Sequence, residues 1–251
     1  MEIDATKTVK EIVLAMPASV KVFEQIGIDY CCGGDKRLDE ACRTAGVQVE
    51  DVARSLEAAG SVAGPEEEET VDWSKQSFAT LMNHIVEKHH TFCRQEVARI
   101  ETLLEKVTEV HGALHSELRR IKALFSELSK ELLMHLIKEE QMLFPYISRM
   151  EEAVTHGTPF LRPPFGTVQN PVQMMVLEHD SAGATLHEIR NLTDNYQLSP
   201  DACSTYHTLF DALRSFESDM HQHVHLENNV LFPRAVAMED AAISGGRAAG
   251  N

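Results

Sequence analysis

Residues 135–145 read HLIKEEQMLFP, and residues 223–233 read HVHLENNVLFP. In both stretches a histidine stands four residues before a glutamate, and the triplet LFP follows at the same offset. Residues four apart lie on one face of an α-helix, so each stretch predicts a helix that presents a His/Glu pair. The repeated pattern HxxxExxxLFP indicates that the two helices are related.

Both pairs fall on apolar faces of their predicted helices. His135 and Glu139 share a face with Ile121, Leu124, Leu128, Leu132, Met142 and Tyr146, and His223 and Glu227 share one with Leu209, Leu213, Phe216, Met220 and Val230. A carboxylate in an apolar interior is costly unless it is paired or bound to a metal ion. Neither face carries a Lys or Arg, so metal binding is the simplest interpretation.

Apolar residues at spacings of three and four continue on both sides of these stretches, and no segment shows the alternation of a strand. We therefore predict an all-α protein whose main part is an antiparallel four-helix bundle. Ser199 would cap the last helix, with Pro200 in its first turn. The four helices are expected at residues 76–109, 113–150, 171–197 and 200–239.

The first and third helices each offer one inward histidine at a matching distance. His90 lies 45 residues before His135, and His179 lies 44 residues before His223. Two similar hairpins would thus supply four imidazoles and two glutamates, which suits two metal ions bridged by the glutamates. Such nitrogen and oxygen ligands favour iron or manganese, with zinc as an adventitious occupant. On the first helix the periodicity slightly favours His89, whereas the hairpin spacing favours His90.

The chain ahead of the bundle has a different character. Residues 1–62 contain short helical patterns separated by glycines, and they predict a small helical domain. Residues 63–76, which include Gly64-Pro65 and four consecutive glutamates, are expected to form an acidic linker. The bundle would then occupy residues 77–240, and the Gly- and Ala-rich end, residues 241–251, is expected to be disordered.

Composition limits the classes of partner. The 251 residues carry a formal net charge of −16, which disfavours nucleic acid and anionic membranes as partners. The chain shows no apolar run long enough for a membrane span and no secretory signal, so we expect a cytoplasmic protein. Cys42, Cys93 and Cys203 are interpreted as small buried residues. His187 could face inward, either as a supporting partner of the site or as ordinary filler. The other histidines are interpreted as solvated, namely His84, His111, His115, His156, His207, His221 and His225.

Four segments resemble a known family. Residues 29–34 read DYCCGG and are similar to the segment that opens the repair of iron centres family, the di-iron proteins that repair iron-sulfur clusters. HLIKEEQMLFP, LEHD at 177–180 and HLENNVLFPRA at 225–235 resemble the haemerythrin-like bundle of that family. The resemblance runs from about Val9 to Val236. It implies two non-haem iron ions, oxo- and carboxylate-bridged, held by His90, His135, Glu139, His179, His223 and Glu227.

The resemblance also implies a function. It is the repair of iron-sulfur clusters damaged by nitrosative or oxidative stress, through iron delivery, nitric oxide chemistry at the di-iron centre, or both. Cys31 and Cys32 would have a thiol role toward the client, either a damaged iron-sulfur protein or a cluster assembly scaffold. Nitric oxide or oxygen would be the small ligand. A homodimer is one possible assembly of the chain. The alternative is a haemerythrin-type oxygen carrier, or a gas or iron sensor, but haemerythrin proper uses five histidines where this chain shows four.

Overall fold

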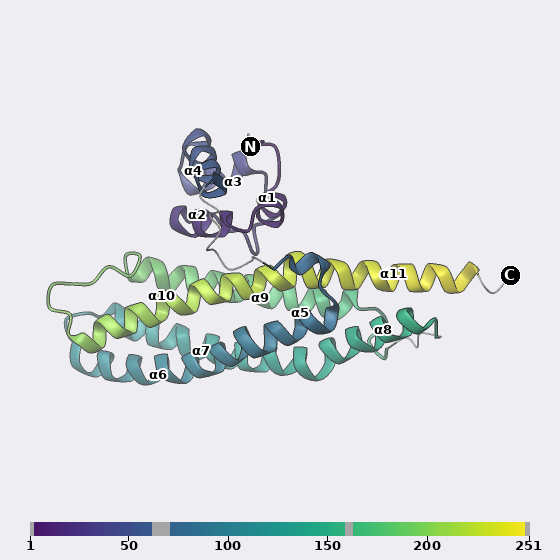
Figure 1. Ribbon diagram of the computed structural model, residues 1–251. Coiled ribbons are helices and arrows are strands. Elements are labelled where there is room, and N and C mark those ends of the chain that lie inside the picture. The colour runs from purple at the N-terminus through teal and green to yellow at the C-terminus, as the bar shows by residue number, and fades with distance from the viewer. Residues whose placement is uncertain (1–2, 62–70, 159–162, 249–251) are drawn as a thin grey trace. The chain divides into compact units, whose positions relative to one another are not determined.

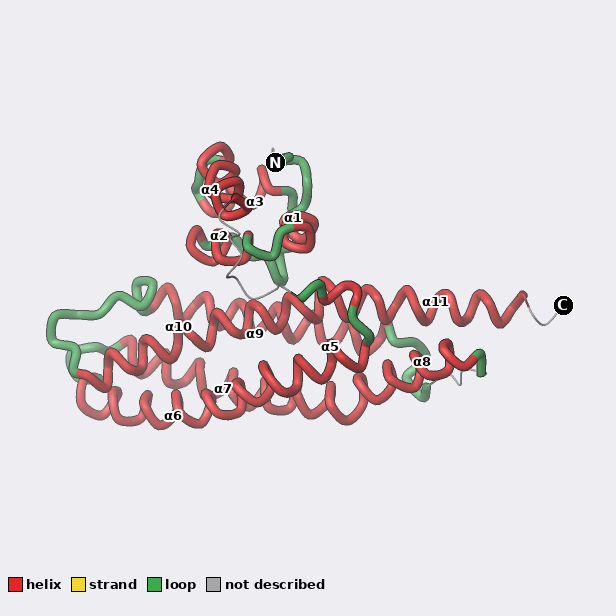
Figure 2. The backbone as a smooth tube through the Cα atoms, in the orientation of Figure 1, coloured by secondary structure: helices red, strands yellow, loops and turns green. Residues whose placement is uncertain are grey.

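A computed structural model describes residues 3–61, 71–158 and 163–248. Within these ranges the regular structure is helical (Figures 1 and 2), apart from an isolated bridge between Thr8 and Arg37. This confirms the predicted all-α class. None of the helices in the described part of the chain combines the length and the apolar character that a membrane crossing requires.

Two compact units make up the chain, and each is described by itself. The first contains residues 1–76 and 224–230, and the second contains residues 77–223 and 231–251. The segment 224–230 is continuous with the last long helix, so its residues are treated with that helix. Most of the acidic linker predicted at 63–76 lies outside the described residues, and its end forms a short 3₁₀ turn, η1 (Trp73–Lys75).

The N-terminal unit is built from short helices around one small core. Thr8 and Glu11 form a capping box at the first helix, and Gly27 and Gly46 end the second and third in left-handed conformations that a glycine adopts without strain. Phe23, Leu38 and several other apolar side chains are fully buried between the helices. The helices are α1 (Val9–Ala15), α2 (Ser19–Ile26), α3 (Leu38–Ala45) and α4 (Val49–Ser61).

Four long helices form the bundle, and three of them are divided by a π-helical turn. α6 packs on α7, α7 packs on α9, and α8 packs on both α5 and α11. The segments of the four helices, in chain order, are α5 (Phe78–His84), η2 (Ile85–His90) and α6 (Thr91–His111); α7 (Glu117–Lys138), η3 (Glu139–Leu143) and α8 (Phe144–His156); α9 (Gln169–Leu192); and α10 (Ser204–His225), η4 (Leu226–Leu231) and α11 (Phe232–Ala248).

The π turns shift the apolar faces of the helices by one residue. In the first helix the buried positions Phe78, Leu81 and Met82 precede η2, and Cys93 and Val97 follow it. A π turn closes i→i+5 hydrogen bonds and so accommodates an extra residue in the helix. The same effect explains Met142, which a regular helix would place on the inner face and which is 52% exposed just after Glu139.

Two expectations about the last helix were wrong. It begins at Ser204, four residues after the predicted start, because Ser199, Pro200 and Asp201 belong to the preceding loop. At the other end α11 continues to Ala248, so the predicted disordered tail is helical through that residue. Alanines favour helix, and each residue added to an existing helix gains a hydrogen bond without a new nucleation cost. Residues 249–251 lie outside the described residues.

Candidate metal centre

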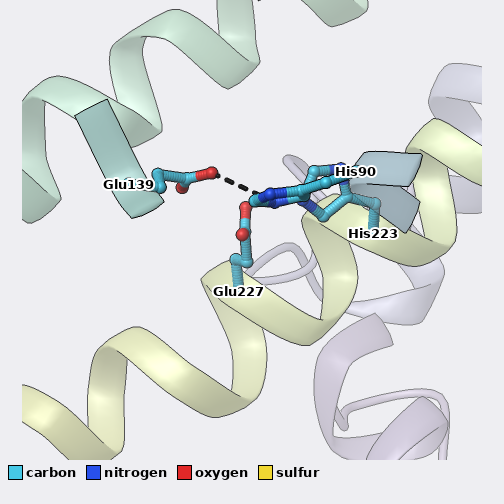
Figure 3. A group of neighbouring side chains, drawn as sticks. All are labelled: His90, Glu139, His223 and Glu227. Atoms are coloured by element: carbon cyan, nitrogen blue, oxygen red, sulfur yellow. Dashed lines mark hydrogen bonds and ion pairs between the residues drawn. The ribbon is translucent and has the colours of Figure 1, made fainter. Parts of the chain in front are cut away.

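Six side chains from the four helices converge in the interior of the bundle. They form two groups, one of His90, Glu139, His223 and Glu227 and one of His135, Glu139, His179 and Glu227, and within each group the ligand atoms lie within 4.8 Å of one another. Figure 3 shows the first group. All six residues are at most 2% exposed. Both glutamates belong to both groups, which is the arrangement that two bridged metal ions require.

The distances inside the groups match those between ligands of one metal ion. The Nε2 atoms of His90 and His223 are 3.2 Å apart, and those of His135 and His179 are 3.0 Å apart. Glu139 presents Oε2 to His90 at 3.4 Å and Oε1 to His135 at 3.3 Å. Two ligand atoms bound about 2.1 Å from one ion are separated by about 3.0 to 3.4 Å, depending on the bond angle.

Two further carboxylates orient the imidazoles from outside. Glu140 Oε1 lies 2.7 Å from Nδ1 of His90 and also accepts a hydrogen bond from Arg94 at 2.8 Å. Partial burial would raise the pKa of Glu140, but the hydrogen bonds from His90 and Arg94 outweigh it and hold the pKa below its ordinary value. Glu140 is therefore an anion that accepts a hydrogen bond from the Nδ1–H group of His90.

The second group repeats this arrangement with different residues. Glu178 Oε2 lies 2.8 Å from Nδ1 of His135, and Oε1 accepts from Lys138. Burial would raise the pKa of Glu178, but the hydrogen bonds from Lys138 and His135 lower it overall. A proton fixed on Nδ1 leaves a lone pair on Nε2 of the neutral imidazole.

The donor set therefore fits a cation. The outer carboxylates hold the Nδ1 protons of His90 and His135, so the lone pairs of their Nε2 atoms point into the centre, each toward another imidazole and a glutamate oxygen. Electron-rich atoms at these distances repel one another unless a positive charge lies between them. Imidazole and carboxylate donors without a thiolate suit iron, manganese or zinc.

The π turns lie at the converging residues themselves. His90 ends η2, Glu139 begins η3, and Glu227 lies within η4, whereas the helix that carries His179 is a regular α-helix throughout. π turns are rare and occur frequently at functional sites. Regular periodicity on the first helix favours His89, and the extra residue accommodated by η2 is the reason that His90 takes the inward position.

His89 is buried beside the two groups but belongs to neither. Its Nδ1 atom lies 2.9 Å from Oδ1 of Asp219, and its ring is parallel to that of His223 with the centroids 5.5 Å apart. His89 thus packs against His223 and is held by a carboxylate on α10. The sequence alone did not identify Glu140 or Asp219. Glu140 could have been found, because it directly follows Glu139 in the sequence.

A pocket of about 500 Å³ opens between α7 and α9 and reaches the second group of ligands. His135 and His179 lie in its wall, together with Lys138 and Glu178. Two exposed apolar side chains at its rim, Met134 and Leu177, are 58% and 63% exposed. The pocket gives a small, uncharged molecule a route toward one side of the centre.

Cys31 and Cys32 lie in a tight turn of the N-terminal unit. Their backbone N–H groups donate to Oδ1 of Asp29 at 3.0 and 2.9 Å, and their Sγ atoms are 3.9 Å apart. The hydrogen bond to Cys32 and burial raise the pKa of the Cys31 thiol. A Cβ atom at Gly34 would lie 2.9 Å from the carbonyl oxygen of Tyr30, so the turn requires glycine there.

Two interpretations of single residues were wrong. Cys203 is exposed, because it lies in the loop before α10 rather than in the core. His111 is buried, because it ends α6 where that helix meets the same loop, and its Nε2 atom lies 3.2 Å from Sγ of Cys203. Cys42 and Cys93 are fully buried, as predicted.

Comparisons with known proteins agree with this geometry. Residues 81–235 match the hemerythrin HHE cation binding domain, and residues 5–60 match a domain of unknown function, DUF542 or ScdA_N. A probable iron-sulfur cluster repair protein of Haemophilus influenzae is 30% identical over 92% of this chain and 97% of its own length. The iron-sulfur cluster repair protein YtfE of Yersinia pseudotuberculosis is 32% identical over 91% of this chain and 96% of its own length.

The matches cover both units, and the bundle match includes all six converging residues. The bundle is thus a cation-binding domain with two buried His/Glu groups that share Glu139 and Glu227. The chain belongs to the hemerythrin HHE cation-binding family and, through relatives matched over more than nine tenths of its length, to the iron-sulfur cluster repair proteins.

Proposed function

We propose that the bundle holds two iron ions and uses them to repair iron-sulfur clusters damaged by nitric oxide or oxidants. One ion would be held by His90 and His223 and the other by His135 and His179, with Glu139 and Glu227 shared. The observation that carries this proposal is the pair of matched, fully buried groups with both glutamates in common. Nitrogen and oxygen ligands in this ratio suit iron.

The residues around the centre have distinct tasks. Bound ferrous iron would supply electrons and open coordination positions to a small ligand such as nitric oxide. Glu140 and Glu178 hold the Nδ1 protons of His90 and His135 and so keep their Nε2 atoms ready to bind metal. The apolar interior excludes water, and the pocket between α7 and α9 admits the small ligand beside His179.

Iron content tests the proposed centre. After anaerobic loading we expect two irons per chain, with a Mössbauer spectrum of a coupled pair that changes on exposure to nitric oxide. Glu139→Ala or Glu227→Ala should remove most of the iron, since each carboxylate serves both ions. Glu131→Ala, an exposed carboxylate at the rim of the pocket, is the matched control and should load fully. A wild-type content near one or zero would contradict the proposal.

We further propose that Cys31 and Cys32 act on the client, either a damaged iron-sulfur protein or an assembly scaffold. Thiolates are the natural ligands of iron-sulfur clusters and of iron in transit to them. Because its pKa is raised, the Cys31 thiol stays protonated in the absence of metal. Binding of iron would displace this proton, since cysteine binds metal as the thiolate. All five cysteines lie in the described residues without a disulfide, which fits a reducing compartment such as the cytoplasm.

A double variant separates the two units. Cys31→Ser with Cys32→Ser should leave the iron content unchanged and should abolish reactivation of an iron-sulfur enzyme that nitric oxide has inactivated. Equal amounts of iron-loaded protein should be compared. Cys42→Ala, which removes another thiol of the N-terminal unit, is the control. Repair at the wild-type rate by the double variant would show that the two cysteines are structural.

A further inference from the structure

A second cluster of metal-ligand residues lies where α6 turns into α7 and the α9–α10 loop returns to the bundle (Figure 2). It contains His111, His115 and Asp201, and Cys203 lies against His111. His111 is separated from His90 by 21 residues of helix, about 30 Å at the rise of an α-helix. The cluster is therefore independent of the His/Glu groups described above.

The side chains of the cluster converge in pairs. His111 Nε2 lies 3.2 Å from Sγ of Cys203, and His115 Nε2 lies 3.2 and 3.1 Å from the two carboxylate oxygens of Asp201. One ligand atom from each of His111, His115 and Asp201 lies within 4.8 Å of the other two. In a tetrahedral zinc site, neighbouring ligand atoms are about 3.3 to 3.6 Å apart. The observed pairs are already close to that separation.

Local backbone structure brings the four residues together. His111 is the last residue of α6, and the backbone N–H of His115 donates to its carbonyl oxygen at 2.9 Å, which places the two imidazoles one turn apart. The carbonyl oxygen of Cys203 accepts from the N–H groups of Tyr206 and His207 at the start of α10. The cluster thus joins the ends of two helical hairpins.

The charges of the cluster suit a divalent cation. Cys203 supplies a sulfur ligand, and its Sγ atom lies 3.2 Å from Nε2 of His111. Asp201 supplies a carboxylate, and its two oxygens lie 3.2 and 3.1 Å from Nε2 of His115. Metal binding releases the protons of such ligands, and a thiolate and a carboxylate together offset the charge of a divalent cation.

We propose that His111, His115, Asp201 and Cys203 form a second metal site, which binds Zn²⁺. Two imidazoles, one thiolate and one carboxylate make four mixed ligands, the number and type that zinc takes in a closed site. The thiolate distinguishes this set from the His/Glu groups, which contain none. Bound there, zinc ties the α6–α7 turn to the loop before α10. Hydrogen bonding among the four residues without a metal is the competing explanation.

Cobalt is the probe, because Co²⁺ occupies zinc sites and reports thiolate ligation by its absorption. The full-length protein is first loaded with iron, so that the His/Glu groups are filled, and Cys31 and Cys32 are replaced by serine to remove the other pair of adjacent thiols. We expect one Co²⁺ per chain, with a thiolate charge-transfer band and the strong visible bands of a tetrahedral ion. Addition of stoichiometric Zn²⁺ should abolish both the charge-transfer band and the visible bands.

Variants locate the site. Cys203→Ser should remove the charge-transfer band, and His111→Asn should weaken Co²⁺ binding by about 100-fold or more, because even changes outside the ligand sphere cost about 10- to 100-fold. His207→Asn replaces an exposed histidine in the first turn of α10 and should bind Co²⁺ as tightly as the parent protein. Iron content should be unchanged in all three, which reports intact folding.

Thermal unfolding gives a second readout. Zn²⁺ should raise the Tm of the parent protein and of His207→Asn, but not that of Cys203→Ser. The proposal is overturned if no charge-transfer band develops, if the band survives in Cys203→Ser, or if the His207→Asn change weakens binding as much as His111→Asn. The first result would leave the cluster as a hydrogen-bonded contact between two loops.

Discussion

Glu178 Oε2 lies 2.8 Å from Nδ1 of His135, although Glu178 is itself the neighbour of another inward histidine, His179. The helix α9 therefore places His179 in the buried group. The residue before it, Glu178, orients His135, which lies on another helix. The Glu178 carboxylate faces outward, where Lys138 shares it. Loss of this residue should affect metal binding without removing a member of the buried group.

Glu178→Gln should weaken iron binding by about 10- to 100-fold, because the amide no longer holds the Nδ1 proton of His135 as firmly. Glu140→Gln should act similarly through His90. Competition with a chelator of known affinity measures the change, and Glu131→Gln is the control at the same pocket. Unchanged affinity in both variants would show that the outer carboxylates only form surface ion pairs.

His90→Ala should lower the iron content more than His89→Ala, since only His90 belongs to a group that shares Glu139 and Glu227. Metal analysis after anaerobic loading, together with circular dichroism to verify the helices, measures both variants. His89→Ala should chiefly reduce stability, because it removes a buried ring that packs on His223 and contacts Asp219. The reverse order of iron contents would assign the ligand role to His89.

Removal of iron should lower the Tm while most of the helix content remains. The six buried residues then lack the cation that offsets their mutual repulsion, and binding energy is coupled to folding. At a free iron concentration 100 times Kd the stabilisation is about 2.7 kcal/mol, which corresponds to roughly 5 to 10 °C for a bundle of this size. Calorimetry of iron-free and loaded protein measures it. Equal Tm values would indicate a preformed polar core.

Alkylation of Cys203 should accelerate with rising pH around a midpoint near 7, because only the thiolate reacts and the His111 hydrogen bond lowers the pKa of Cys203 to about 7. Below that pH the thiol is protonated and slow. His111→Asn should move the midpoint upward, toward the ordinary value of about 8.5. Mass spectrometry after iodoacetamide treatment gives the rate, with Cys93 as internal control, since burial raises its pKa to about 12. The same midpoint in both proteins would exclude His111 as the cause.

The main features of the fold follow from the sequence because they depend on local spacing. The repeated HxxxExxxLFP predicts two inward His/Glu pairs, and the hairpin spacing adds His90 and His179, which are the six residues that the structure brings together. These inferences compare residues on one helix or in equivalent places of two. They need no knowledge of how the helices pack.

The remaining features depend on contacts between distant parts of the chain or on departures from regular helix. His111 and Cys203 are 92 residues apart, so no local pattern relates them. His90 and Glu140 meet only because the first two helices pack together. The π turns leave no signature in the periodicity until the shifted positions are known, and Met142 was assigned to the wrong face for that reason.

The π turn η2 also determines the rotation of α6 relative to α5. If η2 became a regular α-helix with all of its residues kept, the following 21 residues would turn by about 100° relative to α5. Cys93, Val97 and Ile100 would then leave the core together with His90. The π turn therefore keeps the two apolar halves of the first helix on one face, and its loss would displace the core residues of α6 as well as His90.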